Sequence, residues 1–212
     1  MTNLLYGTRR RTRRQRRRQL VGRAYDMALE VARVLPHRSN VLDVGCGNGY
    51  IAHHLTAMLG AQVLGIDVAQ VADAPIEYLR YDGLRFPVAD NSFDAVLLCY
   101  VLHHAQDFRV VLSEVRRVLR ENGLVVVYED IPNLWWDRFI CWTHDLQWRR
   151  RTGHCVFQQE PEWCRLFRSA GFEVVRERRL SRWRNLAHPV SRWFYVLRAS
   201  GIERLELTPT TV

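Results

Sequence analysis

Three glycines at alternate positions, with an aspartate two residues before the first, form the part of the chain best suited to bind a ligand. Residues 41–50 read V-L-D-V-G-C-G-N-G-Y, an apolar run of strand type followed by a turn. Glycine has no Cβ, so Gly45, Gly47 and Gly49 permit a sharp turn and the close approach of a ligand. The next residues have helical character, and a loop leading into a helix N-terminus can bind a nucleotide-like ligand through its backbone amides.

The spacing of these glycines narrows the class of ligand. Dinucleotide-binding loops read G-x-G-x-x-G, and phosphate-binding Walker loops end in Gly-Lys-Ser/Thr. This loop reads G-x-G-x-G and has no lysine after it. The carboxylate of Asp43 would repel a pyrophosphate, whereas it can pair with an ammonium group.

At this point the sequence resembles the class I S-adenosylmethionine-dependent methyltransferases, whose first motif is D/E-x-G-x-G-x-G. The segment after residue 87 is similar to the branch that methylates quinones and other small molecules. The resemblance covers about residues 20–130 and resumes more loosely in the final third. It implies that S-adenosylmethionine is the cofactor and that its methionine part is held by residues of the loop, namely Asp43, Gly45, Cys46, Gly47, Asn48 and Gly49.

Two further carboxylates follow strand-like segments. Asp67, with Val68 beside it, ends a segment about 20 residues beyond the glycines, the distance at which a βαβ unit delivers a carboxylate to a ribose diol. The alternative is a loop carboxylate that caps a turn. The resemblance assigns Asp82, with Gly83, to the adenine amino group and Tyr100 to the cofactor wall. Asp82 could instead simply start an Asp-Gly turn.

Several titratable residues are expected where an acceptor would lie, at the carboxyl ends of the strands. His103 and His104 directly follow the fourth strand, and an imidazole titrates near neutrality, so either is a candidate catalytic base. The alternative is that their rings pack or cap the next helix. Further candidates for acceptor contact are Tyr25, Asp130, His144 and His154.

Residues that can bind zinc also occur in the final third, but zinc sites usually show paired spacings such as C-x₂₋₄-C and H-x₃₋₅-H. Neither pair is present. We therefore expect no metal site, and we interpret these residues as scattered thiols and core histidines: Cys141, His144, His154, Cys155 and Cys164.

Alternating strand and helix patterns predict an α/β fold with a Rossmann-like, doubly wound and mostly parallel sheet. The resemblance implies seven strands, with the segments 172–180 and 192–198 forming an antiparallel hairpin at the C-terminal edge. We expect a single methyltransferase domain over residues 20–212, in which residues 132–170 are a variable segment that binds substrate or forms a lid. The predicted strands are 40–44, 62–66, 76–81, 93–100 and 123–128, and the predicted helices are 20–35, 50–59, 107–120 and 161–169.

The length and charge of the chain limit the number of domains and the kinds of partner that it can have. The 212 residues suit one domain, and the net charge of +9 is concentrated in eight arginines between positions 9 and 18; the other 23 basic residues nearly balance 22 acidic ones. We expect residues 1–19 to be a mobile basic tail. Three roles are open for it: a solvated run of charge, a segment that contacts an anionic membrane, or an arm that binds nucleic acid. With no export signal and no long apolar run, we expect a cytoplasmic protein with free thiols, and the tail favours peripheral contact with membrane lipid.

The sequence thus predicts an S-adenosylmethionine-dependent methyltransferase that acts on a small or lipid-like apolar acceptor. One alternative is an RNA or protein methyltransferase that uses the basic tail as an arm. The N/D-P-P-Y/F motif of amino methyltransferases that act on bases is absent, and C-Y-V-L stands at residues 99–102 in its place. The other alternative is a non-catalytic scaffold that binds the cofactor.

Overall fold

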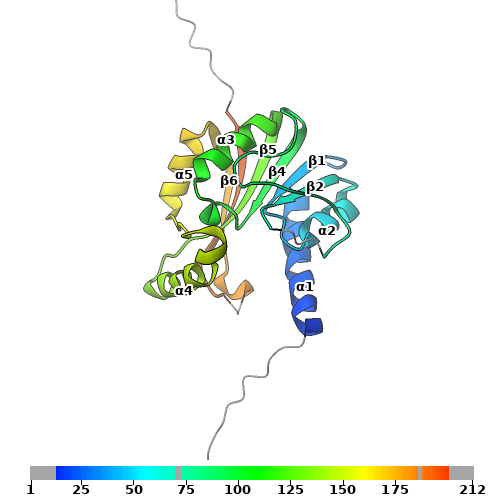
Figure 1. The fold of residues 1–212 in the computed structure, drawn as a ribbon. Helices are drawn as coiled ribbons and strands as arrows, with labels where there is room; N and C mark the ends of the chain where they lie inside the picture. Colours follow the sequence, from blue (N-terminus) through cyan, green and yellow to red (C-terminus); the bar gives the residue numbers. More distant parts are fainter. Residues whose placement is uncertain (1–12, 70–72, 186–187, 201–212) are drawn as a thin grey trace, which may run out of the picture.

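A single twisted sheet forms the centre of the computed structural model, which describes residues 13–69, 73–185 and 188–200 (Figure 1). Its seven strands lie in the order β3-β2-β1-β4-β5-β7-β6. The strands are β1 (Asn40–Val44), β2 (Gln62–Asp67), β3 (Glu77–Arg80), β4 (Phe93–Cys99), β5 (Leu119–Asp130), β6 (Phe172–Leu180) and β7 (Arg192–Ala199). The helices are α1 (Arg13–Ala32), α2 (Tyr50–Leu59), α3 (Phe108–Val118), α4 (Trp135–Thr152) and α5 (Glu160–Ser169), with 3-10 turns η1 (Leu102–His104) and η2 (Arg182–Arg184).

Strand direction confirms the predicted topology. β1 to β5 pair in parallel, whereas β7 is antiparallel to both β5 and β6. The chain runs outward from β1 to β3 on one side and then returns to place β4 on the other side of β1. Ligands of open α/β sheets bind beside the carboxyl ends of the strands at such a switch point. Asp43 of β1 lies there, in register with Gly65 of β2 and Leu97 of β4.

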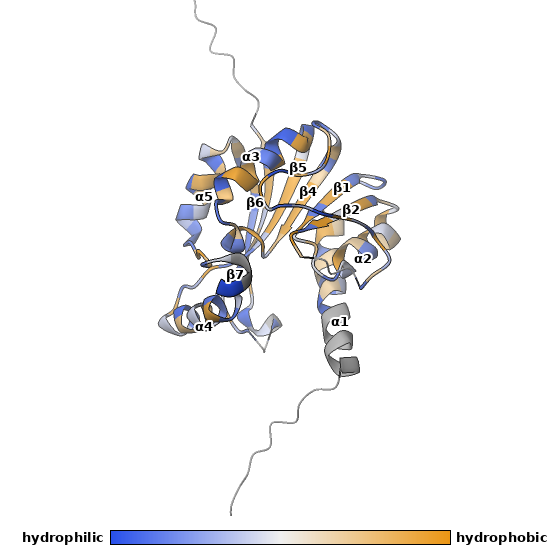
Figure 2. Ribbon diagram, viewed as in Figure 1, coloured by the Kyte–Doolittle hydropathy of each residue, from blue (hydrophilic) through white to orange (hydrophobic). Residues whose placement is uncertain are grey.

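Two apolar layers sandwich the sheet because the central strands are buried on both faces, as parallel strands are. One layer contains Val111 and Val115 of α3 and Trp163 of α5. The other contains Met27 of α1 and Leu55 of α2. Figure 2 shows the apolar strands between these helices, and Figure 1 shows α1 and α4 extending beyond the carboxyl ends of the strands. The loops that follow the strands at this edge lie between these two helices, and they build the site.

The observed elements differ from the predicted ones at three places. α1 begins at Arg13, so the expectation of a mobile tail through residue 19 is wrong for residues 13–19; residues 1–12 lie outside the described residues. α1 also ends at Ala32, before Pro36. β5 begins at Leu119 rather than at residue 123, because Leu119 already pairs with Phe93 and a bulge there accommodates the Asn-Gly turn.

Four tryptophans occur in residues 135–152, for which no helix or strand was predicted. This segment forms the helix α4. In the part of the chain that the structure describes, no helix combines the length and apolar character needed to cross a bilayer.

Candidate functional site

The glycine loop between β1 and α2 turns through left-handed backbone conformations. Gly45 has φ 66°, and a Cβ there would lie 2.6 Å from the Cγ2 atom of Val101, so the loop packs directly on the chain leaving β4. Gly47 has φ 52°, and nothing lies within 4 Å of the place where its Cβ would be. The loop therefore presents an open backbone surface at Gly47, where a ligand can approach closely.

The amides of this loop are already used within the protein. The amides of Gly45 and Cys46 donate to the carbonyl of Ile66, at 2.7 and 3.2 Å, and that of Gly49 donates to the carbonyl of Cys46 at 2.9 Å. The amide of Gly47 donates to Oδ2 of Asp67 at 2.9 Å. These four amides are therefore occupied within the protein, and binding of a ligand through the backbone of the loop stays a prediction. A pyrophosphate is bound by free backbone amides, and these four amides already have partners. The loop is therefore unsuited to bind a pyrophosphate, in agreement with the spacing of its glycines.

Asp43 is the most unusual group beneath the loop. Its side chain is 1% exposed, and neither carboxylate oxygen accepts a hydrogen bond from any described residue. Burial, together with the nearby charge of Asp67, raises the pKa of Asp43 to about 7. A buried carboxylate without a partner is costly, so it points to a cationic group that completes the site.

Asp67 and Asp82 lie at the carboxyl ends of the neighbouring strands β2 and β3. Besides the Gly47 amide, Asp67 accepts the amide of Ala69 at 2.9 Å, so both of its oxygens fix the loop while retaining further lone pairs. Oδ1 of Asp82 accepts the amides of Leu84 and Arg85 at 2.8 and 3.0 Å, which lowers the pKa of this exposed carboxyl. Asp82 thus makes the turn that the sequence offered as its alternative role.

Val68, Gly83 and Asn48 complete the expected cofactor residues. Val68 is 42% exposed, and a Cβ on Gly83 would meet its Cγ1 atom at 3.3 Å, so these two residues lie side by side between Asp67 and Asp82. The carbonyl of Asn48 accepts the amide of Ala74 at 3.1 Å. The residues expected around one cofactor therefore lie along one edge of the sheet.

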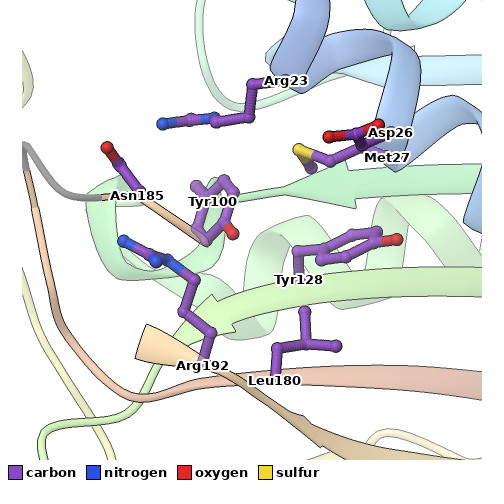
Figure 3. Close-up of a pocket in the computed structure, with 8 residues that line it drawn as sticks. All are labelled: Arg23, Asp26, Met27, Tyr100, Tyr128, Leu180, Asn185 and Arg192. Carbon is purple, nitrogen blue, oxygen red and sulfur yellow. The ribbon is translucent and has the colours of Figure 1, made fainter. Parts of the chain in front are cut away.

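A small hollow lies next to this edge, between α1 and the ends of β4 to β7 (Figure 3). Tyr100 is at its centre, with φ 62°, a conformation that is uncommon for a side chain other than glycine. The Tyr100 ring lies between two guanidinium groups, those of Arg23 at 5.6 Å and Arg192 at 5.8 Å from the ring centroid. The other lining residues are Asp26, Met27, Tyr128, Leu180 and Asn185.

Arg192 is 3% exposed and is held on two sides. Its Nε lies 2.9 Å from Oδ1 of Asp130, and its Nη2 donates to the carbonyl of His188. Its Nη1 is buried and donates to no described residue. An arginine fixed in this way, with one donor unused, is suited to bind an oxygen of a ligand.

The candidates for acceptor contact divide between this hollow and other places. Tyr25 does not line it: Tyr25 is 48% exposed, and its ring lies edge-on to His54 of α2, whereas its helix neighbours Arg23 and Met27 face the hollow. Asp130 does not line the hollow either, but it pairs with Arg192, which does. His154 faces solvent, with a 70% exposed side chain 3.4 Å from Asp145. Tyr25 and His154 therefore lie outside this hollow, and their contact with an acceptor stays a prediction.

Sequence reasoning missed Arg23 and Arg192, which enclose Tyr100. They lie far apart in the chain, on α1 and β7, and no local pattern distinguishes them from the other arginines. Only the packing of α1 against the antiparallel edge of the sheet brings them together.

His103 and His104 occupy the turn η1 and do not line the hollow. His103 is 1% exposed, and its Nδ1 lies 2.5 Å from Oε2 of the buried Glu129. Burial by itself would lower the pKa of His103, but the charge of Glu129 outweighs it and raises the pKa. Oε1 of Glu129 accepts the amide of Leu102 at 2.8 Å, so this carboxylate fixes the whole turn. Catalysis by either histidine stays a prediction.

His104 and His144 face each other across the gap between η1 and α4. Their Nε2 atoms lie 3.2 Å apart, and Nδ1 of His104 lies 3.2 Å from Sγ of Cys155. Burial, together with the charge on His103, lowers the pKa of His104 to about 3 and that of His144 to about 4. Both rings are therefore neutral at physiological pH.

Helix α4 is inverted relative to an ordinary surface helix, which buries its apolar side. Asp137, Cys141 and Asp145 are buried on its inner side, at 0%, 3% and 8% exposure. Asp137 pairs with Arg182 at 3.0 Å, and Asp145 pairs with Arg149 at 2.5 Å. The outer side is apolar, and we name it the aromatic face: Trp135, Trp136, Phe139, Trp142 and Leu146.

Comparison with known proteins gives a consistent result. A family model described as a methyltransferase domain matches residues 13–177. A sterol 24-C-methyltransferase of Gibberella zeae is 38% identical over 102 residues, which are 42% of this chain and 27% of that protein. A demethylmenaquinone methyltransferase of Thermus thermophilus is 34% identical over 122 residues, which are 52% of this chain and 53% of that protein. The matched part thus spans about half or less of these curated relatives.

The fold also matches solved structures. The putative methyltransferase in a complex with the Trm112 methyltransferase activator of Haloferax volcanii superimposes with a TM-score of 0.69 at 18% identity. The match covers 88% of this chain and 94% of that chain. At this identity the likeness concerns the fold.

The unpartnered carboxylate gives a prediction for the ligand-free protein. Because the pKa of Asp43 is higher in the folded than in the unfolded chain, its stabilising contribution is present below about pH 4 and is lost as the pH rises through about 7. The shift corresponds to at most about 4 kcal/mol. Asp43→Asn should therefore raise the free energy of unfolding by about 2 kcal/mol at pH 8 and leave it nearly unchanged at pH 4, measured by urea denaturation. The exposed Glu77→Gln is the control. Equal effects of Asp43→Asn at both pH values would contradict the assignment.

Proposed function

This chain belongs to the class I S-adenosylmethionine-dependent methyltransferases, and we propose that it methylates a small, lipid-like acceptor that carries an acidic hydroxyl or carboxyl group. The observation that carries the proposal is the buried, unpartnered carboxylate of Asp43 below the open backbone of Gly47. S-adenosylmethionine, when bound, supplies an activated methyl group on a positively charged sulfur atom. The task of the protein is then to hold the two reactants in line, which lowers the barrier by up to about 7–11 kcal/mol in well-oriented cases.

Asp43 and Gly47 fit the methionine end of this cofactor. The cofactor carries an ammonium group and a sulfonium, and a positive charge near Asp43 offsets the cost of ionising that carboxyl group. The missing side chain at Gly47 leaves room for the ligand over the loop. We propose that the neighbouring loop residues Gly45, Cys46, Asn48 and Gly49 shape this surface rather than donate hydrogen bonds.

Asp67 and Asp82 suit the nucleoside end. We propose that Asp67 accepts the ribose hydroxyls with the lone pairs that its two backbone contacts leave. Asp82 has only Oδ1 occupied by backbone amides, and we propose that its carboxylate accepts the adenine amino group beside Val68 and Gly83. Two carboxylates in this region favour a ligand that donates hydrogen bonds over one that carries phosphates.

The hollow around Tyr100 is the proposed acceptor site. Arg192 lines it and has an Nη1 donor without a described partner, and Arg23 adds a second positive charge. Two guanidinium groups stabilise an anionic oxygen on the acceptor and lower the pKa of its acidic group. The acceptor then enters as a nucleophile that has already lost its proton, so no separate base is required. Met27 and Leu180 provide apolar contact for the rest of the molecule.

The aromatic face of α4 supports a lipid-like acceptor. Trp135 is 74% exposed and Trp142 is 54% exposed, and the exposed Arg138, Arg149 and Arg150 lie on the same helix. Tryptophan with adjacent arginine is typical of helices that lie in the interface of an anionic membrane. The curated relatives named above act on a sterol and on demethylmenaquinone, both of them apolar molecules. We propose that α4 places the acceptor hollow against an anionic lipid surface.

The two other functions considered from the sequence are not favoured. The arm of an RNA or protein methyltransferase was expected to be a mobile tail through residue 19, but residues 13–19 belong to α1. A non-catalytic scaffold would not require the arginine-lined hollow next to the cofactor edge.

Cofactor binding tests the role of Asp67. Asp67→Asn should raise the Kd for S-adenosylmethionine about 10–100-fold in calorimetry, since hydrogen bonds to a charged group contribute about 1.5–3 kcal/mol. Glu77→Gln, an exposed carboxylate on the adjacent strand, should leave the Kd unchanged. An unaltered Kd in Asp67→Asn would remove this residue from the site, and no binding by the wild type would end the proposal as a whole.

Arg23 tests the acceptor hollow, because its exposed side chain can be replaced without leaving a buried charge. Arg23→Gln should lower the transfer of labelled methyl groups into lipid and quinone extracts about 10-fold, while S-adenosylmethionine affinity stays at the wild-type value. Arg33→Gln, at the other end of α1, is the matched control. Equal transfer by Arg23→Gln and wild type would place the acceptor elsewhere.

Vesicle binding tests the aromatic face. The wild type should co-sediment with vesicles that contain phosphatidylglycerol and far less with pure phosphatidylcholine, and the binding should weaken with salt. The triple variant Trp135→Ser/Phe139→Ser/Trp142→Ser should bind at least 10-fold more weakly, as each side chain contributes roughly 1.5–3 kcal/mol when buried in lipid. Leu79→Ser/Leu84→Ser changes exposed apolar residues elsewhere and should bind normally. Undiminished binding by the triple variant would contradict this role of α4.

A further inference from the structure

Three histidines meet at the carboxyl edge of the sheet. His103 and His104 come from η1, and His144 comes from the inner side of α4. One ring nitrogen of each lies within 4.8 Å of the ring nitrogens of the other two, and the Nε2 atoms of His104 and His144 are 3.2 Å apart. From these positions we propose that His103, His104 and His144 bind a zinc ion that fastens α4 to the sheet.

The distances suit tetrahedral zinc. Zinc binds imidazole nitrogen at about 2.0–2.1 Å, so two nitrogens of a tetrahedral site lie about 3.3–3.4 Å apart. The 3.2 Å separation of His104 and His144 is close to this value. A separation of at most 4.8 Å for the other pairs closes by small rotations of the rings. Three histidines leave the fourth position of the metal to water or another ligand.

The partners of the rings are those that orient metal ligands. A ligating histidine usually donates its second N–H to a carboxylate or another acceptor, which fixes its tautomer. Nδ1 of His103 lies 2.5 Å from Oε2 of Glu129, which leaves Nε2 of His103 for the metal. Nδ1 of His104 lies 3.2 Å from Sγ of Cys155, which leaves its Nε2 beside His144. Glu129 therefore holds the ring of His103 in the ligating tautomer, and the sulfur of Cys155 is placed to accept the Nδ1–H of His104 when its Nε2 binds the metal.

The surroundings also favour a dication. Glu129 is fully buried at the rear of the cluster, and its negative charge offsets part of the charge of the ion. Phe157 stacks on His103 at 4.8 Å and Trp148 lies 5.3 Å from His104, so aromatic rings cover the cluster.

The site gives His144 a role on the inner side of α4. The segment after α4 already attaches to η1, since the amide of Val156 donates to the carbonyl of His103 at 2.8 Å. A zinc ion adds a bond between η1 and the helix itself. The sequence did not indicate this site, because two ligands are adjacent and the third lies 40 residues further along the chain.

Zinc titration of the purified full chain tests the proposal without reference to methyl transfer. After chelator treatment, the wild type should take up one zinc ion per chain, measured by competition with a chromogenic chelator. Cobalt in its place should give the intense visible absorption of a tetrahedral site. Zinc should also raise the Tm of the wild type. Failure to bind zinc would overturn this inference and leave the proposed methyl transfer untouched.

Variants locate the ion. Glu129→Gln can still accept the Leu102 amide, but its side-chain amide would reverse the His103 tautomer, so the zinc Kd should rise about 10–100-fold. His144→Ala should raise the zinc Kd by a larger factor. It should also abolish the zinc-dependent rise in Tm, whatever the stability of this variant without metal. His37→Ala and His154→Ala, which change exposed histidines, should bind zinc as the wild type does. Binding that survives His144→Ala but is lost in Cys164→Ser would place the metal with Glu160 and Glu177 and contradict the proposal.

Discussion

One buried carboxylate without a partner sets the conditions for the rest of the site. Asp43 ends the strand where the sheet reverses its order, so β2 and β4 flank it and the glycine loop covers it. None of the described residues supplies a cation to this carboxyl group, and burial, together with the charge of Asp67, raises its pKa to about 7. A protein tolerates such a group where a ligand completes it, and stability is then given up for binding. The open backbone at Gly47 leaves the approach on that side clear.

Charge is distributed along the carboxyl edge in a way that separates two ligands. Asp43 and Asp67 lie near the ends of β1 and β2, and Asp82 follows β3, so this half of the sheet suits a cationic, hydrogen-bond-donating cofactor. Arg23 and Arg192 gather around Tyr100 on the other half, beyond β4, where an anionic acceptor is favoured. The two reactants of a methyl transfer have these opposite preferences, since one carries a sulfonium and the other supplies an electron pair.

Helix α4 shows how function alters the usual rule for surface helices. Its aromatic face lies outside, and its inner side carries Asp137, His144 and Asp145. The buried carboxylates are paired with arginines, which keeps their burial affordable, and the histidine joins two others from η1. The apolar outer side of α4 suits contact with a lipid surface. Its polar inner side suits attachment to the rest of the protein through ion pairs and a bound metal ion rather than through apolar packing. Both features follow from the same reversed helix.

The sequence by itself determined the doubly wound sheet and the position of Asp43 and the glycines, because strand periodicity and glycine spacing are local properties. It also placed Asp67 and Tyr100 at strand ends. Only the tertiary structure decided that Asp43 lacks a partner, that Arg23 rather than Tyr25 faces the hollow, and that His144 meets His103 and His104. Those facts depend on helix phase and on contacts between residues far apart in the chain. The reversed α4 escaped detection because an aromatic stripe looks the same whether it is buried or exposed.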